Sequence, residues 1–100
     1  SPAAVLSVLA DPTRLAILSH LRGGEHRVSE LTEHLGLAQS TVSQHLAILR
    51  SAGLISSHSH GRANVSRIEN PEAIEQVLAA AESLAAIISA DGASRSKEPQ

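Results

Sequence analysis

The chain has 100 residues, a formal net charge of −2, and no Cys, Met, Phe, Trp or Tyr. Its length predicts a single domain, and the missing cysteines exclude disulfides and thiolate metal sites. The missing aromatic residues argue against domains that bind single-stranded nucleic acid by stacking bases on aromatic rings. Because a small core of Leu, Ile, Val and Ala gains little burial energy, the composition favours a dimer that shares its core.

The charges are divided unevenly along the chain. Residues 12–67 contain six arginines, three glutamates and all six histidines, whereas residues 68–90 contain four glutamates and no basic residue. This asymmetry can leave a positive face on an acidic protein, as nucleic-acid binding requires, although two ordinary solvated surfaces give the same pattern. No apolar run approaches the roughly 20 residues of a membrane span, so we expect a cytoplasmic protein without a membrane partner.

Four helices are predicted in the first half of the chain. Asp11 is a typical helix N-cap, and Pro12 suits the first position of the helix that it opens. Gly23 and Gly24 end that helix, and Gly36 forms a tight turn between the two helices that follow. Apolar residues at helical spacing fill each segment. The predicted ranges are 3–10, 12–22, 29–36 and 39–51.

The second half predicts a hairpin and one long helix. Two short strands, 54–59 and 64–69, are separated by a loop at residues 60–63. A helix then opens at Pro71 and continues to about Ser89. The order α-α-α-α-β-β-α is mainly α with a small β-hairpin, which is typical of a winged helix-turn-helix. We therefore predict one such domain over residues 1–90 and a disordered polar tail over residues 91–100, with a generic small α+β domain as the alternative.

The helix predicted at 39–51 has two different faces. Val42, Leu46 and Leu49 form its buried stripe, and the opposite face is small and polar at its N-terminal half. Such a helix end suits a major groove, where hydroxyls contact base edges or phosphates and Gln44 can pair with adenine. Arg62 at the hairpin tip suits a minor groove or a phosphate, and Arg27 is a weaker candidate for a phosphate contact. The residues predicted to contact DNA are Gln39, Ser40, Thr41, Ser43, Gln44, His45, Arg50 and Arg62, with a packed, hydrogen-bonded histidine as the alternative for His45.

Several segments together resemble the ArsR/SmtB family of bacterial winged-helix repressors. They are ADPTRL at 10–15, VSEL at 28–31, STVSQHLAILR at 40–50, AGLI at 52–55 and Gly61-Arg62, within a resemblance that covers about Val5 to Ala90. The resemblance implies a homodimer that binds a two-fold operator in double-stranded DNA until an inducer releases it. The residues that it implies across the dimer, from the first and last helices, are Val5, Leu6, Leu9, Ile74, Val77, Leu78, Ala81, Leu84 and Ile88.

The metal sites that this resemblance implies lack their ligands here. A family Cys-x-Cys motif aligns with Arg27-Val28-Ser29, and a family site on the last helix aligns with Asn70, Glu72, Ser83 and Ala86. No cofactor is therefore certain. His58 and His60 lie on one face of a predicted strand and could hold Ni²⁺ or Zn²⁺ with further ligands, although two solvated histidines are the alternative. His20, His26 and His34 could also converge around the loop before the third helix.

The second strand of the hairpin departs from the family pattern. Alternation places Asn64, Ser66 and Ile68 on the core side, and only Ile68 is strongly apolar. We therefore expect a loosely packed, mobile wing whose amides exchange faster than those of residues 42–49.

Two other classes of function are open to this sequence. A winged helix can bind proteins, so the chain could be an interaction module with its acidic last helix as a docking surface, or a regulator that senses no metal and needs a regulatory partner protein. An enzyme is not expected. The sequence contains no HExxH, no glycine-rich phosphate loop, no GxSxG and no cysteine, and nothing assembles a nucleophile, a base and an orienting acid.

Overall fold

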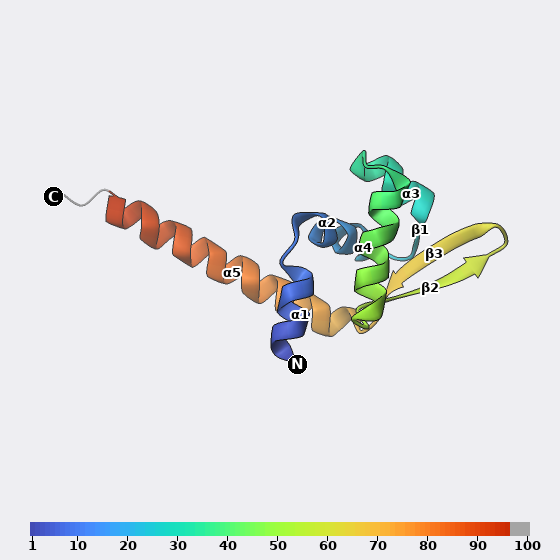
Figure 1. The fold of residues 1–100 in the computed structure, drawn as a ribbon. Helices are drawn as coiled ribbons and strands as arrows, with labels where there is room; N and C mark the ends of the chain where they lie inside the picture. The colour runs from blue at the N-terminus through green and yellow to red at the C-terminus, as the bar shows by residue number, and fades with distance from the viewer. Residues whose placement is uncertain (97–100) are drawn as a thin grey trace. The chain divides into compact units, whose positions relative to one another are not determined.

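The structure, a computed structural model, describes residues 1–96, which divide into two units after Asn70 (Figure 1). The first unit contains four helices and a small sheet, and the second is a single helix, α5. The elements of the first unit are α1 (Pro2–Leu9), α2 (Pro12–Leu21), β1 (His26–Arg27), α3 (Val28–Leu35), α4 (Gln39–Ser51), β2 (Ile55–His60) and β3 (Ala63–Ile68). This is the predicted winged helix-turn-helix, with one additional short strand.

The ends of α2 and α3 follow from local chemistry. The Asp11 carboxylate accepts a hydrogen bond from the backbone N–H of Arg14 at 3.0 Å, and Pro12 occupies the first turn of α2. Gly36 ends α3 with a positive φ of 65°, a conformation that a residue without a Cβ adopts at little cost. The chain can therefore turn sharply and enter α4 at Gln39, the residue predicted from the sequence.

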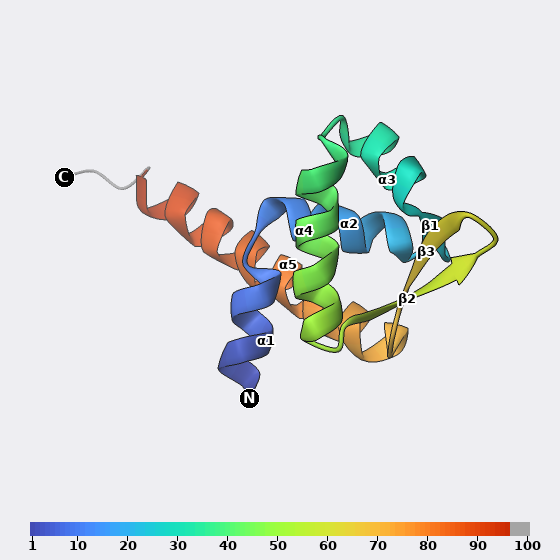
Figure 2. The ribbon, with the colours of Figure 1, turned by 45° about the vertical axis from the view of Figure 1, so that its right-hand side comes forward.

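The core of the first unit is aliphatic and lies between α2, α3 and α4. The predicted stripe of α4 is confirmed, because Val42, Leu46 and Leu49 are at most 3% exposed. Each such side chain contributes about 1.5–3 kcal/mol on burial, which fixes the rotation of α4 about its own axis. In Figure 2, α4 lies across α2, with which it is in contact. The opposite face of α4 is thereby turned outward.

The sheet has three strands in the order β1-β3-β2, whereas only the β2–β3 hairpin was predicted. In β1, His26 pairs with Ser66 and Arg27 pairs with Val65, both antiparallel. A two-residue strand carries no periodic pattern, so the sequence gives no sign of it. Its effect is large, because β3 becomes the central strand and the base of the wing is held beside the start of α3.

The base of the wing is well packed, which corrects the expectation of a loosely packed wing there. Ser66 is fully buried, and its Oγ lies 3.0 Å from the Oγ of Ser57, so its hydroxyl has a hydrogen-bond partner inside the sheet. Val65 is also buried, at 4% exposed. Asn64 is exposed rather than turned to the core. For the tip, residues 59–62, fast amide exchange remains a prediction.

The second unit is one helix, α5 (Pro71–Ser96). It continues past Ser89, so the predicted disordered tail is wrong over residues 91–96, and residues 97–100 lie outside the described part of the chain. Gly92 costs a helix only about 1 kcal/mol relative to alanine, which an otherwise alanine-rich helix tolerates. Ile74 and Leu78 are buried, whereas Leu84, Ile87 and Ile88 are each more than half exposed.

The stretch Pro71–Ala93 of α5 is long and apolar enough to cross a membrane, with a mean hydropathy of 1.4. By length and composition, the expectation that no segment approaches such a span is therefore wrong. Glu82 lies at the middle of this stretch, and a charged side chain at the centre of a bilayer costs roughly 2.5–3.5 kcal/mol.

Candidate DNA-binding surface

The outward face of α4 carries the polar residues that the sequence singled out. Gln39, Ser40, Ser43 and Gln44 are exposed, and Thr41 is half-buried. None of them is needed for the core, because the opposite face of the same helix supplies the buried stripe. Hydroxyl and amide groups on an exposed helix can donate to and accept from base edges and phosphates.

The first turn of α4 adds donors from the backbone. Its N-cap is Ala38, which provides no side-chain hydrogen bond, and its first residue is Gln39. The first amides of a helix have no partner within the helix, and the helix dipole makes this end attractive to an anion. The polar face and the uncapped amides thus lie at the same end of α4.

His45 lies on the inner flank of α4 rather than on its outward face. Its side chain is 20% exposed, and its Nδ1 lies 3.3 Å from Nη1 of Arg14 and 3.9 Å from Oδ1 of Asp11. Because arginine can only donate, the neutral ring accepts at Nδ1 and carries its proton on Nε2. The geometry favours the packed, hydrogen-bonded histidine over a base contact.

Arg14 joins three helices, a role that the sequence analysis missed. Its guanidinium donates from Nε to the carbonyl oxygen of Val8 in α1 and from Nη1 to His45 in α4. Its backbone N–H donates to Asp11, and this hydrogen bond lowers the pKa of that carboxyl, with a further contribution from the nearby positive charge. The ADPTR segment therefore joins α4 to α1 and α2 on the side of α4 away from its exposed polar face.

Arg50, near the end of α4, contacts the wing. Its Nη1 donates to the Oγ of Ser57 in β2 at 3.4 Å, and Ser57 in turn shares a hydrogen bond with buried Ser66. Arg50 itself is exposed, so it can bond to Ser57 and still face solvent. The two hydrogen bonds, from Arg50 to Ser57 and between Ser57 and Ser66, connect the exposed surface of α4 to the interior of the sheet.

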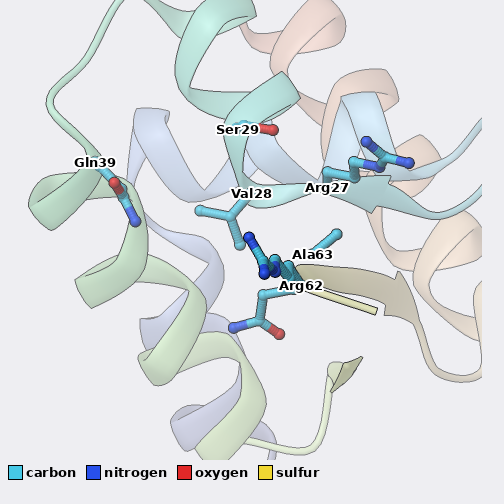
Figure 3. Close-up of a pocket in the computed structure, with 7 residues that line it drawn as sticks. Arg27, Val28, Ser29, Gln39, Arg62 and Ala63 are labelled. Atoms are coloured by element: carbon cyan, nitrogen blue, oxygen red, sulfur yellow. The ribbon is translucent and has the colours of Figure 1, made fainter. Parts of the chain in front are cut away.

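Arg62 lies in the turn between β2 and β3, after Gly61 with its φ of 66°. It borders a pocket of about 210 Å³ between the wing and the starts of α3 and α4. Figure 3 shows its guanidinium in front of Val28, with the amide of Gln39 on the α4 side of the pocket. The structure thus brings Arg62, Gln39 and Arg27 to one surface. The residues that line the pocket are Arg27, Val28, Ser29, Gln39, Arg62, Ala63 and Asn64.

The histidines give no arrangement for a metal within the described part of the chain. His58 is about half exposed, and its Nε2 lies 3.7 Å from Oε2 of Glu25. The expected convergence of three histidines is confirmed. The centroid of the His34 ring lies 5.1 Å from the centroid of the His20 ring and 6.3 Å from that of the His26 ring. Even so, among the described residues no group of three or more His, Cys, Asp or Glu side chains is placed to hold an ion.

Comparisons with known proteins agree with this geometry. Residues 11–57 match the family model described as "Bacterial regulatory protein, arsR family". The HTH-type transcriptional regulator NmtR of Mycobacterium tuberculosis is 44% identical over 63 residues, which cover 63% of this chain and 52% of that protein. The chain spans between about half and two thirds of the length of the curated relatives that it matches.

Solved structures cover more of the chain. The crystal structure of Rv0081 from M. tuberculosis has a TM-score of 0.79 and 33% identity, and covers 90% of this chain and 91% of that one. The transcriptional repressor BigR from Xylella fastidiosa has a TM-score of 0.70 and 32% identity, and covers 77% and 79%. The fold, the exposed polar face of α4 and these likenesses agree, and the chain belongs to the ArsR/SmtB family of winged-helix, DNA-binding transcriptional regulators and repressors.

Proposed function

We propose that this protein is a transcriptional repressor that binds double-stranded operator DNA as a homodimer. The observation that supports it best is the exposed polar face at the start of α4, beside the basic tip of the wing. In the proposed complex the first two turns of α4 enter a major groove, and the wing follows the adjacent backbone or minor groove. Operator binding would take place in the cytoplasm.

Gln44 is the proposed base reader, because its amide can donate to and accept from adenine at the same time. Ser40, Thr41 and Ser43 add hydroxyl contacts from the same face, and Gln39 lies at the helix start, where the free amides attract a phosphate. Arg50 and Arg62 add positive charge on either side of this face. His45 has no direct DNA contact in this proposal, since Arg14 occupies its Nδ1.

The proposed pairing of two copies rests on exposed apolar side chains. Leu6 in α1 and Leu84 and Ile88 in α5 are 56–57% exposed in the single chain. Burying such side chains contributes roughly 25 cal/mol for each Å² of apolar surface removed from water. Two α4 helices in a symmetric dimer could then read half-sites about 34 Å apart. Val5, Val77 and Ala81 are half-buried or exposed and belong to the proposed interface set. Leu9, Ile74 and Leu78 complete that set, but they are already buried in the single chain and would add little new area.

The test is DNA binding by fluorescence anisotropy, with a duplex from upstream of the protein's own gene and a shuffled duplex of equal length. Preference for the upstream duplex, with an affinity that falls linearly on a log scale with salt concentration, is the expected result. Equal and weak binding to both duplexes at low salt would overturn the proposal.

Sedimentation of the DNA-free protein tests the pairing separately. A dimer supports the homodimer, whereas a monomer that binds a different protein through α5 would favour the interaction-module alternative. The proposal assigns no metal as inducer, because the described residues offer no group of ligands for one.

A further inference from the structure

The pocket between the wing and the two helix starts has the character of an anion site. It is lined by two arginines, one hydroxyl and two side-chain amides, and by no carboxylate. Its residues come from four elements (β1, α3, α4 and β3) and from the turn between β2 and β3, so it forms only when the wing is seated against the starts of α3 and α4. Among the described residues, no carboxylate lies within ion-pair distance of the guanidinium of Arg27 or Arg62.

Two helix N-termini face this pocket together. Ser29 lies in the first turn of α3, and Gln39 is the first residue of α4, whose N-cap Ala38 leaves the backbone amides without a side-chain acceptor. The nearest acidic residue of α3, Glu30, has its Oε1 bound at 3.0 Å by the backbone N–H of Arg27. The uncapped start of α4 therefore adds partial positive charge to the full charges of the two arginines, whereas the Glu30 carboxylate offsets the partial charge at the start of α3.

The two arginines lie differently in the pocket. Figure 3 shows the guanidinium of Arg62 inside it, next to Val28, while that of Arg27 is directed outward along β1. Arg27 is exposed, and its long side chain can rotate toward the pocket without disturbing the core. An oxyanion in the pocket would thus have one donor already in position and a second that moves onto it.

We propose that this pocket holds one phosphate group of the DNA backbone, bound by Arg62, Arg27, the Ser29 hydroxyl and the first amides of α4. The inference rests on the proposed function and deepens it, because it gives the wing and α4 a shared phosphate that sets their register on the duplex. Phosphate contacts position a protein on DNA without reading sequence. The same chemistry would accept free inorganic phosphate.

A double-variant cycle on operator DNA tests the shared phosphate. Arg27→Ala and Arg62→Ala should each weaken binding to specific and shuffled DNA alike, and each should lower the salt slope by about 0.9 for each half-site, or about 1.8 for the dimer. If both side chains bind one phosphate, the double variant loses no more slope than either single variant, and the fold-losses do not multiply. The control is Arg67→Ala, an exposed arginine of β3 whose Nε lies 3.8 Å from Glu69, and its slope should stay unchanged.

Neutral methylphosphonate linkages, placed one at a time along the duplex, locate the contact. The proposal requires a single position in each half-site that removes the effect of both arginine variants. It would be overturned by fold-losses that multiply, by a double variant that loses twice the slope of either single variant, or by two different sensitive positions within one half-site. Circular dichroism checks that each variant folds.

Inorganic phosphate titrated into the DNA-free protein distinguishes the two sources of the ligand. Phosphate should shift the amide resonances of Ser29 and Gln39 in the wild-type protein, and Arg62→Ala should abolish these shifts, which would support an oxyanion site. If phosphate causes no shift and no methylphosphonate linkage in the duplex affects binding, the oxyanion site is overturned. Such shifts without any sensitive linkage in the DNA would assign the pocket to a soluble anion and overturn the backbone assignment. If the wild-type protein does not prefer its operator, the proposed function fails. If the preference is intact but the effects of Arg27→Ala and Arg62→Ala are independent, only the shared phosphate is wrong.

Discussion

Helix α4 exposes one face and helix α5 is exposed over most of its described length, and the residues that they expose differ in kind. Along α4 they are Ser and Gln at the N-terminal half, and along α5 they are Leu and Ile at the C-terminal half. Polar groups that keep their hydrogen-bonding capacity in water can exchange water for bases at little cost, whereas exposed Leu and Ile gain by leaving water. The difference supports the proposed roles of α4 in binding DNA and of α5 in pairing two copies of the chain.

The largest effect is expected from placing charge on the apolar face of α5. The double variant Leu84→Glu with Ile88→Glu should convert the dimer to a monomer, because four carboxylates would otherwise be buried in one interface. Operator affinity should then fall by about 100-fold or more, since two linked half-site contacts become one. Sedimentation and anisotropy measure the two effects.

Ser83→Glu is the matched control for that variant. It adds a carboxylate to α5 at about 100° from Leu84 and about 140° from Ile88 around the helix axis, on the side of Glu72, so the dimer should persist. If the Leu84→Glu, Ile88→Glu double variant remained dimeric and kept full operator affinity, the proposed role of α5 in dimerisation would be wrong.

The next effect concerns the exposed face of α4. Gln44→Ala should reduce preference for the operator over shuffled DNA by roughly 5- to 150-fold, the 1–3 kcal/mol expected of one bidentate base contact. Binding to shuffled DNA should hardly change. Ser51→Ala, exposed at the far end of α4, should leave both affinities unchanged. Equal losses on both duplexes would show that Gln44 does not read a base.

A smaller effect is expected where α4 is attached to the wing. Ser66→Ala removes the buried hydroxyl that bonds to Ser57, and it should destabilise the fold by about 1 kcal/mol in urea unfolding. Ser59→Ala changes an exposed serine on the same hairpin and should stay within about 0.5 kcal/mol of the wild type. Equal stability of both variants would mean that the buried serine pair adds nothing to the wing.

The smallest effect concerns the hydrogen bond between Asp11 and Arg14 at the start of α2 and its dependence on pH. The pKa of Asp11 is lowered from 3.8 mainly by the Arg14 backbone N–H, so its stabilising contribution is complete above that pH and is lost as the pH falls below it. Asp11→Asn keeps the N-cap but removes the titration. Its stability, measured by thermal unfolding, should therefore decline less between pH 5 and pH 3 than that of the wild type.

Asp91→Asn is the control for that measurement, because it removes an exposed carboxylate at the far end of the chain. Its acid profile should follow the wild type. If Asp11→Asn also follows the wild type, the hydrogen bond at the start of α2 does not contribute to acid stability.

Most of the fold was predictable because its signals are local. The cap at Asp11, the turn at Gly36 and the stripe of Val42, Leu46 and Leu49 each depend on residues within one helix or one turn, and the structure confirms them. The strand β1 was not predictable, since two residues have no period and their pairing partner lies about 40 residues away in the chain. The end of α5 was missed because polar residues after Ala90 indicated a tail, although they remain compatible with a helix.

The candidate site was predicted only as far as helical geometry allows. An outward face follows from an inward stripe, so Ser40, Ser43 and Gln44 could be placed without a structure. His45 lies on the flank between the two faces, and its side is decided by Arg14, 31 residues earlier. The pocket around Arg62 depends on where the wing packs, which a single sequence does not encode in any local pattern.

The division of α4 into two faces separates folding from recognition within thirteen residues. Because the side chains that anchor the helix are not those that face outward, the outer positions can be exchanged as a set while the scaffold and its stability are kept. A grafted α4 with new residues at 40, 43 and 44 would offer a route to regulators of altered sequence preference, built on an unchanged pair of subunits.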